Sequence, residues 1–196
     1  MYRTAVLILA LSFAGFAQTG TKSSKTGGNP DATFANKAAQ GNMAEVALGK
    51  LATQNAQSDD VKKFGQRMVD DHTKAEQDLE GVASKNTINL PADVSPQQKA
   101  EQKRLEKLNG AAFDRAYMAM MVKDHTKDVA EFKKEANRTS ANPDLKDYAK
   151  RTYPTLEDHL TNAKAVNDAL PKSSGKKGAA KPTSTGASGG AGLLLI

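Results

Sequence analysis

The chain has 196 residues, no cysteine and no tryptophan, and only 5% of its residues are aromatic. The lack of cysteine excludes disulfides, thiolate catalysis, thiolate metal sites and a lipid-anchored N-terminal cysteine. The excess positive charge lies at the two ends, since residues 1–30 and 171–196 together carry seven lysine or arginine residues and no acidic residue. Removing these seven charges from the net +6 leaves residues 31–170 at −1, which argues against a nucleic-acid partner.

Residues 1–17 have the layout of a secretory signal peptide. Arg3 precedes an apolar run at residues 5–16, and small residues precede an expected cleavage site before Gln18. The run is shorter than the roughly 20 residues that span a bilayer, so an uncleaved membrane anchor is the less favoured alternative. Residues 18–30 are rich in Gly, Ser, Thr and Lys and predict a flexible leader. We therefore expect an exported protein, either periplasmic or associated with the outer membrane.

Four long segments repeat apolar residues at helical spacing. The expected starts are Asn29-Pro30, Ser58, Asn109-Gly110 and Asn142-Pro143, and Pro171 ends the last segment. In the first two segments the inward positions alternate steps of four and three. These positions are Phe34, Ala38, Gly41, Glu45, Leu48 and Ala52, then Val61, Gly65, Met68, His72, Ala75, Leu79 and Val82.

The connection between the second and third segments, residues 86–110, is long enough to run the length of a bundle. Within it, Ser95 opens a capping-box pattern that predicts a short helix to about Leu108. We expect an all-α fold at residues 31–170, a ferritin-like four-helix bundle whose long crossover contains this extra helix. Residues 171–196 are rich in Lys, Gly, Ser and Thr and predict a disordered basic tail.

The three histidines of the chain share two properties. Each follows an aspartate, and each falls on the apolar face of a different long segment; they are His72, His125 and His159. Glu45 occupies an equivalent inward position in the first segment. Measured from the two short turns, these four side chains lie at one height to within about one helical turn, roughly 5 Å. We therefore expect them to converge near the middle of the bundle.

A transition-metal site is one interpretation of this convergence. Three histidines and a glutamate are typical ligands of zinc, copper, iron or manganese, and a buried glutamate is costly unless it is paired or coordinated. The neighbouring Asp71, Asp124 and Asp158 lie about 100° around each helix, so they are candidates for orienting an imidazole of another helix. The competing interpretation is a polar cluster in which Glu45 bonds one or two histidines and no metal binds.

The sequence around the first histidine recurs around the second. Residues 68–74 and 121–127 differ at a single position, Asp70 against Lys123. Such an echo indicates either duplication of a helix or a common structural demand at one level of the bundle.

Four stretches together resemble a known family. They are FANKAAQGNMAEVALGKLA (34–52), VKKFGQRMVDDHTKA (61–75), FDRAYMAMMVKDHTKDVAEF (113–132) and LKDYAKRTYPTLEDHLTNA (145–163). In order and spacing they are similar to an exported bacterial family catalogued as domain of unknown function 4142, whose members are often labelled outer-membrane proteins and grouped with ferritin-like folds. The resemblance implies a ferritin-like bundle in the periplasm or cell envelope, and it implies no established activity.

The wider ferritin-like pattern fits only in part. Di-iron members carry Glu-x-x-His on two of their helices. Here Val69 and Leu156 stand three residues before His72 and His159, so the bridging carboxylates are missing and a di-iron centre is disfavoured.

Three functional hypotheses follow. The first is a metal-binding bundle for metal handling or stress protection. The second is a non-catalytic envelope structural or interaction protein, whose inward polar residues specify packing and whose basic tails contact anionic lipid or cell-wall polymers. A redox enzyme is the least favoured because the carboxylate set is incomplete, so we lean toward a protein that is not an enzyme. The sequence defines neither the metal nor the oligomeric state.

Overall fold

The computed structural model describes residues 29–172, and within this range the chain forms five α-helices and no β-strand. The helices are α1 (Pro30–Asn55), α2 (Asp59–Lys85), α3 (Pro96–Leu105), α4 (Gly110–Asn137) and α5 (Pro143–Ala169). The expected signal peptide at 1–17, nearly all of the leader at 18–30 and the tail beyond Lys172 lie outside the described residues. None of these five helices is long and apolar enough to cross a membrane.

Side-chain caps define the first residues of α1, α3 and α5. The Asn29 side chain accepts a hydrogen bond from the backbone N–H of Asp31 at 3.0 Å, and Asn142 does the same for Asp144 at 2.9 Å. Ser95 heads the predicted capping box of α3. In all three helices a proline stands in the first turn, where its missing N–H removes no intrahelical hydrogen bond.

The start of α2 depends on a residue from another helix. Ser58 stands at the predicted N-cap position, but its side chain makes no capping hydrogen bond. Instead Asp114 of α4, which is buried, accepts hydrogen bonds from the backbone N–H groups of Gln57 and Ser58 at 3.0 Å each. The carboxylate therefore ties the α1–α2 turn to the second helix pair.

The crossover helix α3 ends at Leu105, earlier than the predicted end near Leu108. The N–H of Leu108 donates to the carbonyl of Leu105 at 2.9 Å, and this three-residue spacing takes the chain out of the α-helical pattern. The side chain of Asn55 donates to the carbonyl of Leu108 at 3.1 Å, while Leu105 itself is fully buried. These contacts hold the end of the crossover against the bundle.

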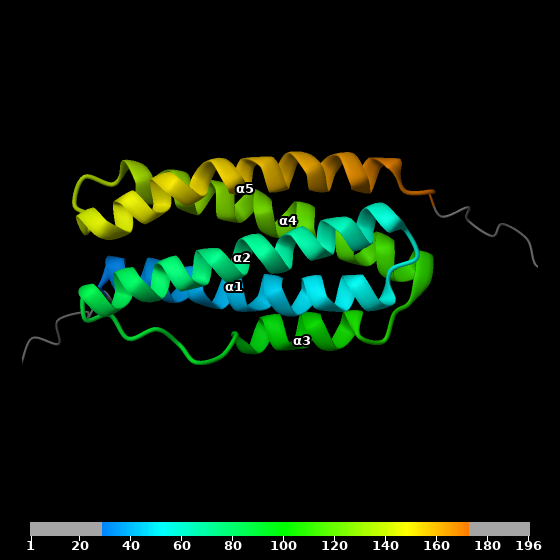
Figure 1. Cartoon of the computed structure of the whole chain (residues 1–196), viewed down its shortest axis with the longest axis horizontal. Helices are drawn as coiled ribbons and strands as arrows, with labels where there is room; N and C mark the ends of the chain where they lie inside the picture. The colour runs from blue at the N-terminus through cyan, green and yellow to red at the C-terminus, as the bar shows by residue number, and fades with distance from the viewer. Residues whose placement is uncertain (1–28, 173–196) are drawn as a thin grey trace, which may run out of the picture.

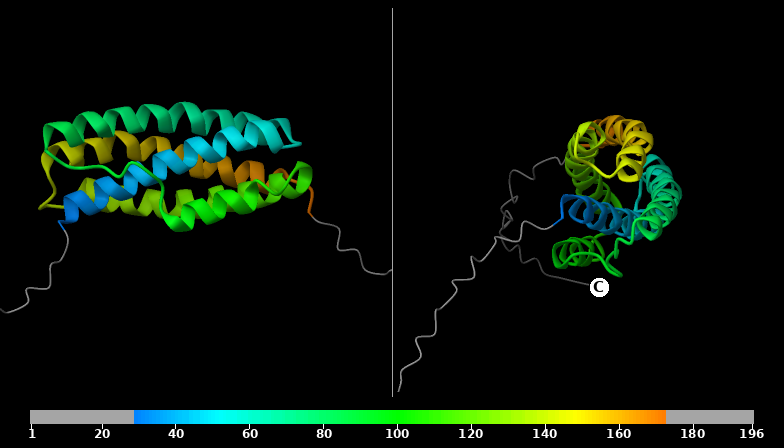
Figure 2. Two further views of the ribbon diagram at one scale, coloured as in Figure 1. Left: turned by 90° about the horizontal axis from the view of Figure 1, so that it is seen from below. Right: turned by 90° about the vertical axis from the view of Figure 1, so that its left-hand side faces the viewer.

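Two antiparallel helix pairs form the bundle, α1 with α2 and α4 with α5 (Figure 1). The crossover, residues 86–109, returns along the bundle from the end of α2 to the start of α4, and α3 lies beside α1 (Figures 1 and 2). The two pairs meet through α2 against α5 and α1 against α4, and α3 packs on α1 and α4. The predicted four-helix bundle with a long crossover and an extra helix is confirmed.

A polar layer separates two apolar clusters of the bundle core. One cluster includes Phe64, Met68, Phe113, Tyr117 and Met121. The other includes Phe34, Leu79, Phe132, Leu145 and Tyr148. Between the two clusters, each long helix contributes buried polar residues: Asn42 and Glu45 from α1, His72 from α2, His125 from α4 and His159 from α5. The histidines therefore occupy the middle of the core, as the sequence predicts.

Two glycines set the spacing of α1 and α2. A Cβ added to Gly49 would lie 2.5 Å from the carbonyl oxygen of Gly65, and one added to Gly65 would lie 2.6 Å from the Cβ of Ala52. The backbones of the two helices thus approach more closely than side chains would allow. One heptad away along each helix stand Asn42 and His72, so the glycine contact fixes the distance between these two polar residues.

Candidate metal centre

The three histidines of the chain meet in the core. His72, His125 and His159 are 4%, 0% and 1% exposed, so water has almost no access to any of them. Their ring centroids are 5.2–5.7 Å apart. One ligand atom from each ring lies within 4.8 Å of the ligand atoms of the other two. The predicted convergence of the three imidazoles is therefore present.

Each imidazole uses one nitrogen in a hydrogen bond to an acceptor outside the cluster. His72 Nδ1 lies 3.0 Å from Asn42 Oδ1, and His125 Nδ1 lies 3.0 Å from the Met121 carbonyl. His159 Nε2 lies 2.8 Å from Asp71 Oδ2. Because all three partners accept hydrogen bonds, the three ring nitrogens donate, and each tautomer is set by its partner.

Asn42 is itself held in one orientation. Its amide nitrogen donates to Glu76 Oε2 at 2.9 Å and to the Tyr148 hydroxyl at 3.4 Å, which leaves its oxygen for His72. A flipped amide would bring its oxygen against the carboxylate of Glu76. The Asn42 carbonyl therefore faces the imidazole, and the Nδ1 nitrogen of His72 carries the hydrogen.

Among residues 29–172, the second nitrogen of each ring has no hydrogen-bond partner. These atoms are Nε2 of His72, Nε2 of His125 and Nδ1 of His159, and all three are buried. By the tautomer argument each carries a lone pair. Buried polar atoms without partners are rare in folded proteins, and each needs an explanation, such as a ligand. Three in one place, on three converging rings, are the kind of donor set that a three-histidine metal site uses.

Burial keeps the imidazoles neutral. It lowers the pKa of His72 well below the ordinary value, with further lowering from the other two histidines. Burial also lowers the pKa of His125 to about 4. The pKa of His159 is lowered by burial as well, although its hydrogen bond to Asp71 opposes this effect. At neutral pH all three lone pairs are therefore available to a cation.

Of the three predicted aspartates, only Asp71 contacts an imidazole. Burial raises its pKa, but hydrogen bonds from His159 and from Arg67 outweigh burial and hold the pKa below the ordinary value. Arg67 Nε lies 3.1 Å from Asp71 Oδ2, and Arg67 Nη2 lies 4.0 Å from the carboxylate of Asp158. Asp158 is 76% exposed at its side chain, so it forms the outer end of this chain of ion pairs and contacts no histidine among the described residues. Asp124 pairs with Lys127 at 3.5 Å instead of a histidine.

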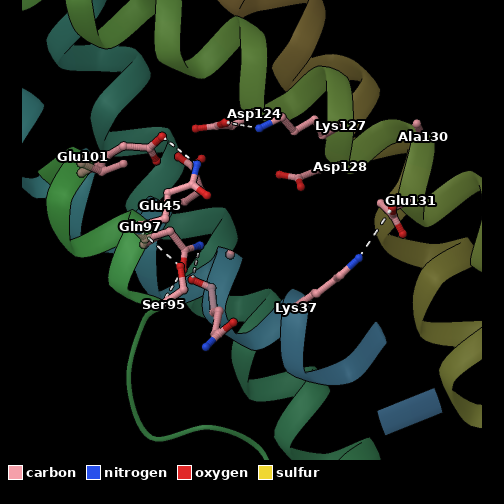
Figure 3. Close-up of a pocket in the computed structure, with 15 residues that line it drawn as sticks. Lys37, Glu45, Ser95, Gln97, Glu101, Asp124, Lys127, Asp128, Ala130 and Glu131 are labelled. Carbon is pink, nitrogen blue, oxygen red and sulfur yellow. Dashed lines mark hydrogen bonds and ion pairs between the residues drawn. The ribbon is translucent and has the colours of Figure 1, made fainter. Parts of the chain in front are cut away.

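Glu45 is buried, but it is not part of the histidine group. Only His72, His125 and His159 form a metal-competent cluster within residues 29–172. Asn42 takes the place on α1 that faces the imidazoles. Glu45 lies three residues further on, about 60° around the helix, and lines a cavity with Asp124 and Asp128 (Figure 3). The predicted fourth ligand therefore points to a neighbouring site.

Asn42 and Asp128 lie beside the histidine cluster, and the apolar pattern of the sequence does not predict either of them. Asn42 lies off the four-and-three series that defines the inward face of α1. Asp128 follows Asp124 by one helical turn and so shares its face of α4, which was a detectable signal.

Comparison with known proteins gives a family and a fold. Residues 16–166 match the family described as Domain of unknown function (DUF4142). A DUF305 fragment from Deinococcus radiodurans is similar in structure, with a TM-score of 0.63, 15% identity, and coverage of 73% of this chain and 98% of that one. A DUF305 protein from Streptomyces coelicolor, described as a candidate secreted protein, gives a TM-score of 0.57 at 16% identity, covering 68% and 88% of the two chains. No curated protein matches the chain.

The family match includes the whole histidine cluster. It begins before α1 and ends inside α5, and it takes in most of the chain. At 15% and 16% identity, the two solved structures show the bundle fold alone. This chain belongs to the DUF4142 family, a domain of unknown function.

Proposed function

We propose that this protein is an exported helical bundle that binds one transition-metal ion through His72, His125 and His159. One observation carries the proposal: three imidazoles converge in the core, and each has one buried nitrogen without a partner among residues 29–172 while its opposite nitrogen is anchored. A packing role alone would leave three polar atoms unsatisfied, at a cost of about 1–3 kcal/mol each. A bound cation would satisfy all three together.

The donor chemistry favours zinc or copper. Neutral imidazoles suit zinc, copper, iron and nickel, whereas manganese prefers carboxylates, and the cluster contains none. Nitrogen ligands at about 2.0–2.1 Å around a tetrahedral ion lie about 3.3 Å apart, so small rotations would bring the ring nitrogens together from their present 4.8 Å limit. Three protein ligands leave a fourth position for water or another ligand.

The anchoring residues would orient the ligands. Asn42, Asp71 and the Met121 carbonyl accept the outer N–H of one imidazole each, as outer partners do in known metal sites. Arg67 holds Asp71 in turn. In such sites the loss of one outer partner costs about 10–100-fold in metal affinity.

The cell envelope is the proposed location. The signal-peptide pattern at residues 1–17 supports export, and the Streptomyces coelicolor neighbour is described as a candidate secreted protein. The basic residues at 171–196 would add contacts with anionic lipid or cell-wall polymers. Metal handling or protection from metal stress in the envelope is the role that these features suit best.

Elemental analysis tests the proposal. The mature chain is purified without a metal-affinity tag, and its metal content and thermal melt are measured before and after chelation. We expect one equivalent of metal and a lower Tm after chelation, since a ligand at a hundredfold excess over its Kd stabilises the native state by about 2.7 kcal/mol.

Two variants make the test specific. His125→Leu keeps an apolar side chain in the core and should abolish metal binding and the response to chelator. Asp158→Asn, beside His159 in sequence but exposed, should behave as wild type. A wild-type chain that takes up no zinc or copper, with a melt that chelator does not move, would favour the competing hypothesis that the histidines only specify packing.

A further inference from the structure

An acidic cavity opens beside the histidine cluster, between α1, α3 and α4. It has a volume of about 660 Å³, and five carboxylates line it: Glu45, Glu101, Asp124, Asp128 and Glu131 (Figure 3). Two lysines, Lys37 and Lys127, are the basic residues in its lining. The excess of carboxylates gives the cavity a negative potential, and concave sites focus such a field.

Two of these carboxylates form no ion pair with any residue of the described range 29–172. Lys127 pairs with Asp124 at 3.5 Å, and Lys37 pairs with Glu131 at 3.9 Å. Glu45 is 3% exposed, and its Oε2 atom has no hydrogen-bond partner among residues 29–172. Asp128 forms no ion pair within 4.0 Å in the same range.

Burial and mutual repulsion make these two carboxylates costly as anions. Burial raises the pKa of Asp128 to about 7, with a further contribution from Asp124. Burial also raises the pKa of Glu45, and repulsion from Asp128 and Asp124 adds to the effect. A cation in the cavity would offset both the cost of burial and the repulsion between the carboxylates. An unpartnered buried carboxylate lining the cavity is thus a second sign, besides the number of acids, that the cavity receives a positive ligand.

A smaller cavity continues from the acidic one toward the histidines. It has a volume of about 60 Å³ and reaches His72, Asn42 and the apolar side chains Phe34, Phe132 and Leu156. The two cavities share four lining residues: Lys37, Gly41, Asp128 and Glu131. Such a volume is enough for a water molecule or a metal ion.

Gly41 stands where the two cavities meet. A Cβ added at this position would meet no atom within 4 Å, so the missing side chain leaves the way open. On the opposite side of the cluster, Asp71, Arg67 and Asp158 form a chain of ion pairs over His159. The approach past Gly41 and Asp128 thus combines acidic charge with open volume between the surface and an imidazole.

We infer that the acidic cavity is the entrance through which a hydrated divalent cation reaches the histidine cluster, with Gly41 leaving the passage open and Asp128 guiding the ion. The inference rests on the proposed function, because it names the route to that metal site. Carboxylates would attract the hydrated ion, and the neutral imidazoles would replace its water at the end of the path. The carboxylates of the route change the rate of loading, while the histidines determine the final affinity.

The rate of Co²⁺ uptake tests the route. Apo protein is mixed with Co²⁺ in a stopped-flow instrument, and the visible absorption of the bound ion gives the rate; release is followed after adding excess chelator. Gly41→Leu should slow uptake and release by at least about tenfold with an unchanged Kd, because a plug hinders passage in both directions. Gly81→Leu is the matched control, since Gly81 also lies within a helix with nothing within 4 Å of an added Cβ.

A second variant tests the electrostatic part of the route. Asp128→Asn should slow uptake about tenfold at low ionic strength, within the range by which electrostatic steering changes association rates. The difference from wild type should shrink at high salt, where charges are screened within about 3–10 Å.

The outcomes separate the route from the site. If Gly41→Leu and Asp128→Asn load at the wild-type rate while His125→Leu fails to bind Co²⁺, the route is wrong and the metal site stands. If the wild-type chain binds no Co²⁺, the proposed function and the route both fail.

Discussion

Gly65→Ala should destabilise the bundle even though alanine is the better helix former. The added Cβ would lie 2.6 Å from the Cβ of Ala52 and 2.9 Å from the carbonyl oxygen of Gly49. Neither neighbour is the flexible end of a side chain, so relief requires the helices to separate by about 1 Å. Overpacking of this kind costs about 1–3 kcal/mol, against a gain of about 1 kcal/mol in helix propensity.

Gly81→Ala provides the matched control. Gly81 lies on the exposed side of the same helix, and an added Cβ would meet nothing within 4 Å. This variant should therefore show only the propensity gain, a stabilisation of about 0.5–1 kcal/mol. The two alanine variants should differ in free energy of unfolding by about 1–3 kcal/mol, with Gly65→Ala the less stable.

Urea denaturation followed by far-ultraviolet circular dichroism measures the difference. Midpoints compared at a common m-value give the change in the free energy of unfolding. If Gly65→Ala is as stable as Gly81→Ala, the close approach of α1 and α2 does not constrain the bundle, and the reasoning fails. If the helices do separate, the hydrogen bond from His72 to Asn42, one heptad away, should lengthen and weaken metal binding as well.

Two further substitutions test other contacts. Asp114→Ala leaves the N–H groups of Gln57 and Ser58 without their acceptor and should lower the free energy of unfolding by about 2–4 kcal/mol in urea denaturation. Asp114→Asn retains one acceptor oxygen and should cost about half as much. A loss below about 0.5 kcal/mol for the alanine variant would contradict this account. Asp128→Asn tests the acidic cavity: the folded chain holds the pKa of Asp128 at about 7, against an ordinary value of 3.8, so between these pH values it binds more protons than the unfolded chain. As pH rises from about 4 to 7, the stability of the wild type should fall relative to that of Asp128→Asn by about 2 kcal/mol, after allowance for partial exposure. If thermal melts show the same difference between the two proteins across this pH range, the pKa assigned to Asp128 is wrong.

The apolar pattern of the sequence predicts where a residue lies along the bundle axis better than it predicts which neighbouring helix its side chain faces. The helix starts at Asn29, Ser95 and Asn142 follow from side-chain chemistry that acts over three residues, so the sequence alone reveals them. The level of the histidines follows from the fixed rise per residue of a helix. The direction in which a side chain points determines which neighbouring helix it meets. To predict that direction, the apolar pattern would have to distinguish positions only about 60° apart around the helix.

The α1 helix shows why this distinction was missed. Half of its buried residues are alanines, among them Ala35, Ala38, Ala39 and Ala44, so its apolar face is broad and has no sharp centre. Both Asn42 and Glu45 fall within that face. The packing of α1 against α2 through Gly49 and Gly65 determines which of the two meets His72, and this contact involves residues far apart in sequence.

The sequence repeat shared by α2 and α4 also shows that local sequence does not determine which neighbour a side chain meets. In both copies the histidine is buried, and the threonine after it donates to the carbonyl four residues earlier at 2.6 Å, through Thr73 and Thr126. The shared sequence thus produces the same threonine contact in both copies. The aspartates before the histidines nevertheless differ in role, since Asp71 accepts a hydrogen bond from His159 while Asp124 lines the acidic cavity with Glu45. Their neighbours cause the difference: α5 lies beside Asp71, and α1 and α3 enclose the cavity beside Asp124. One motif used twice therefore supplies an anchor for the proposed metal ligands through Asp71 and part of the proposed cation route through Asp124.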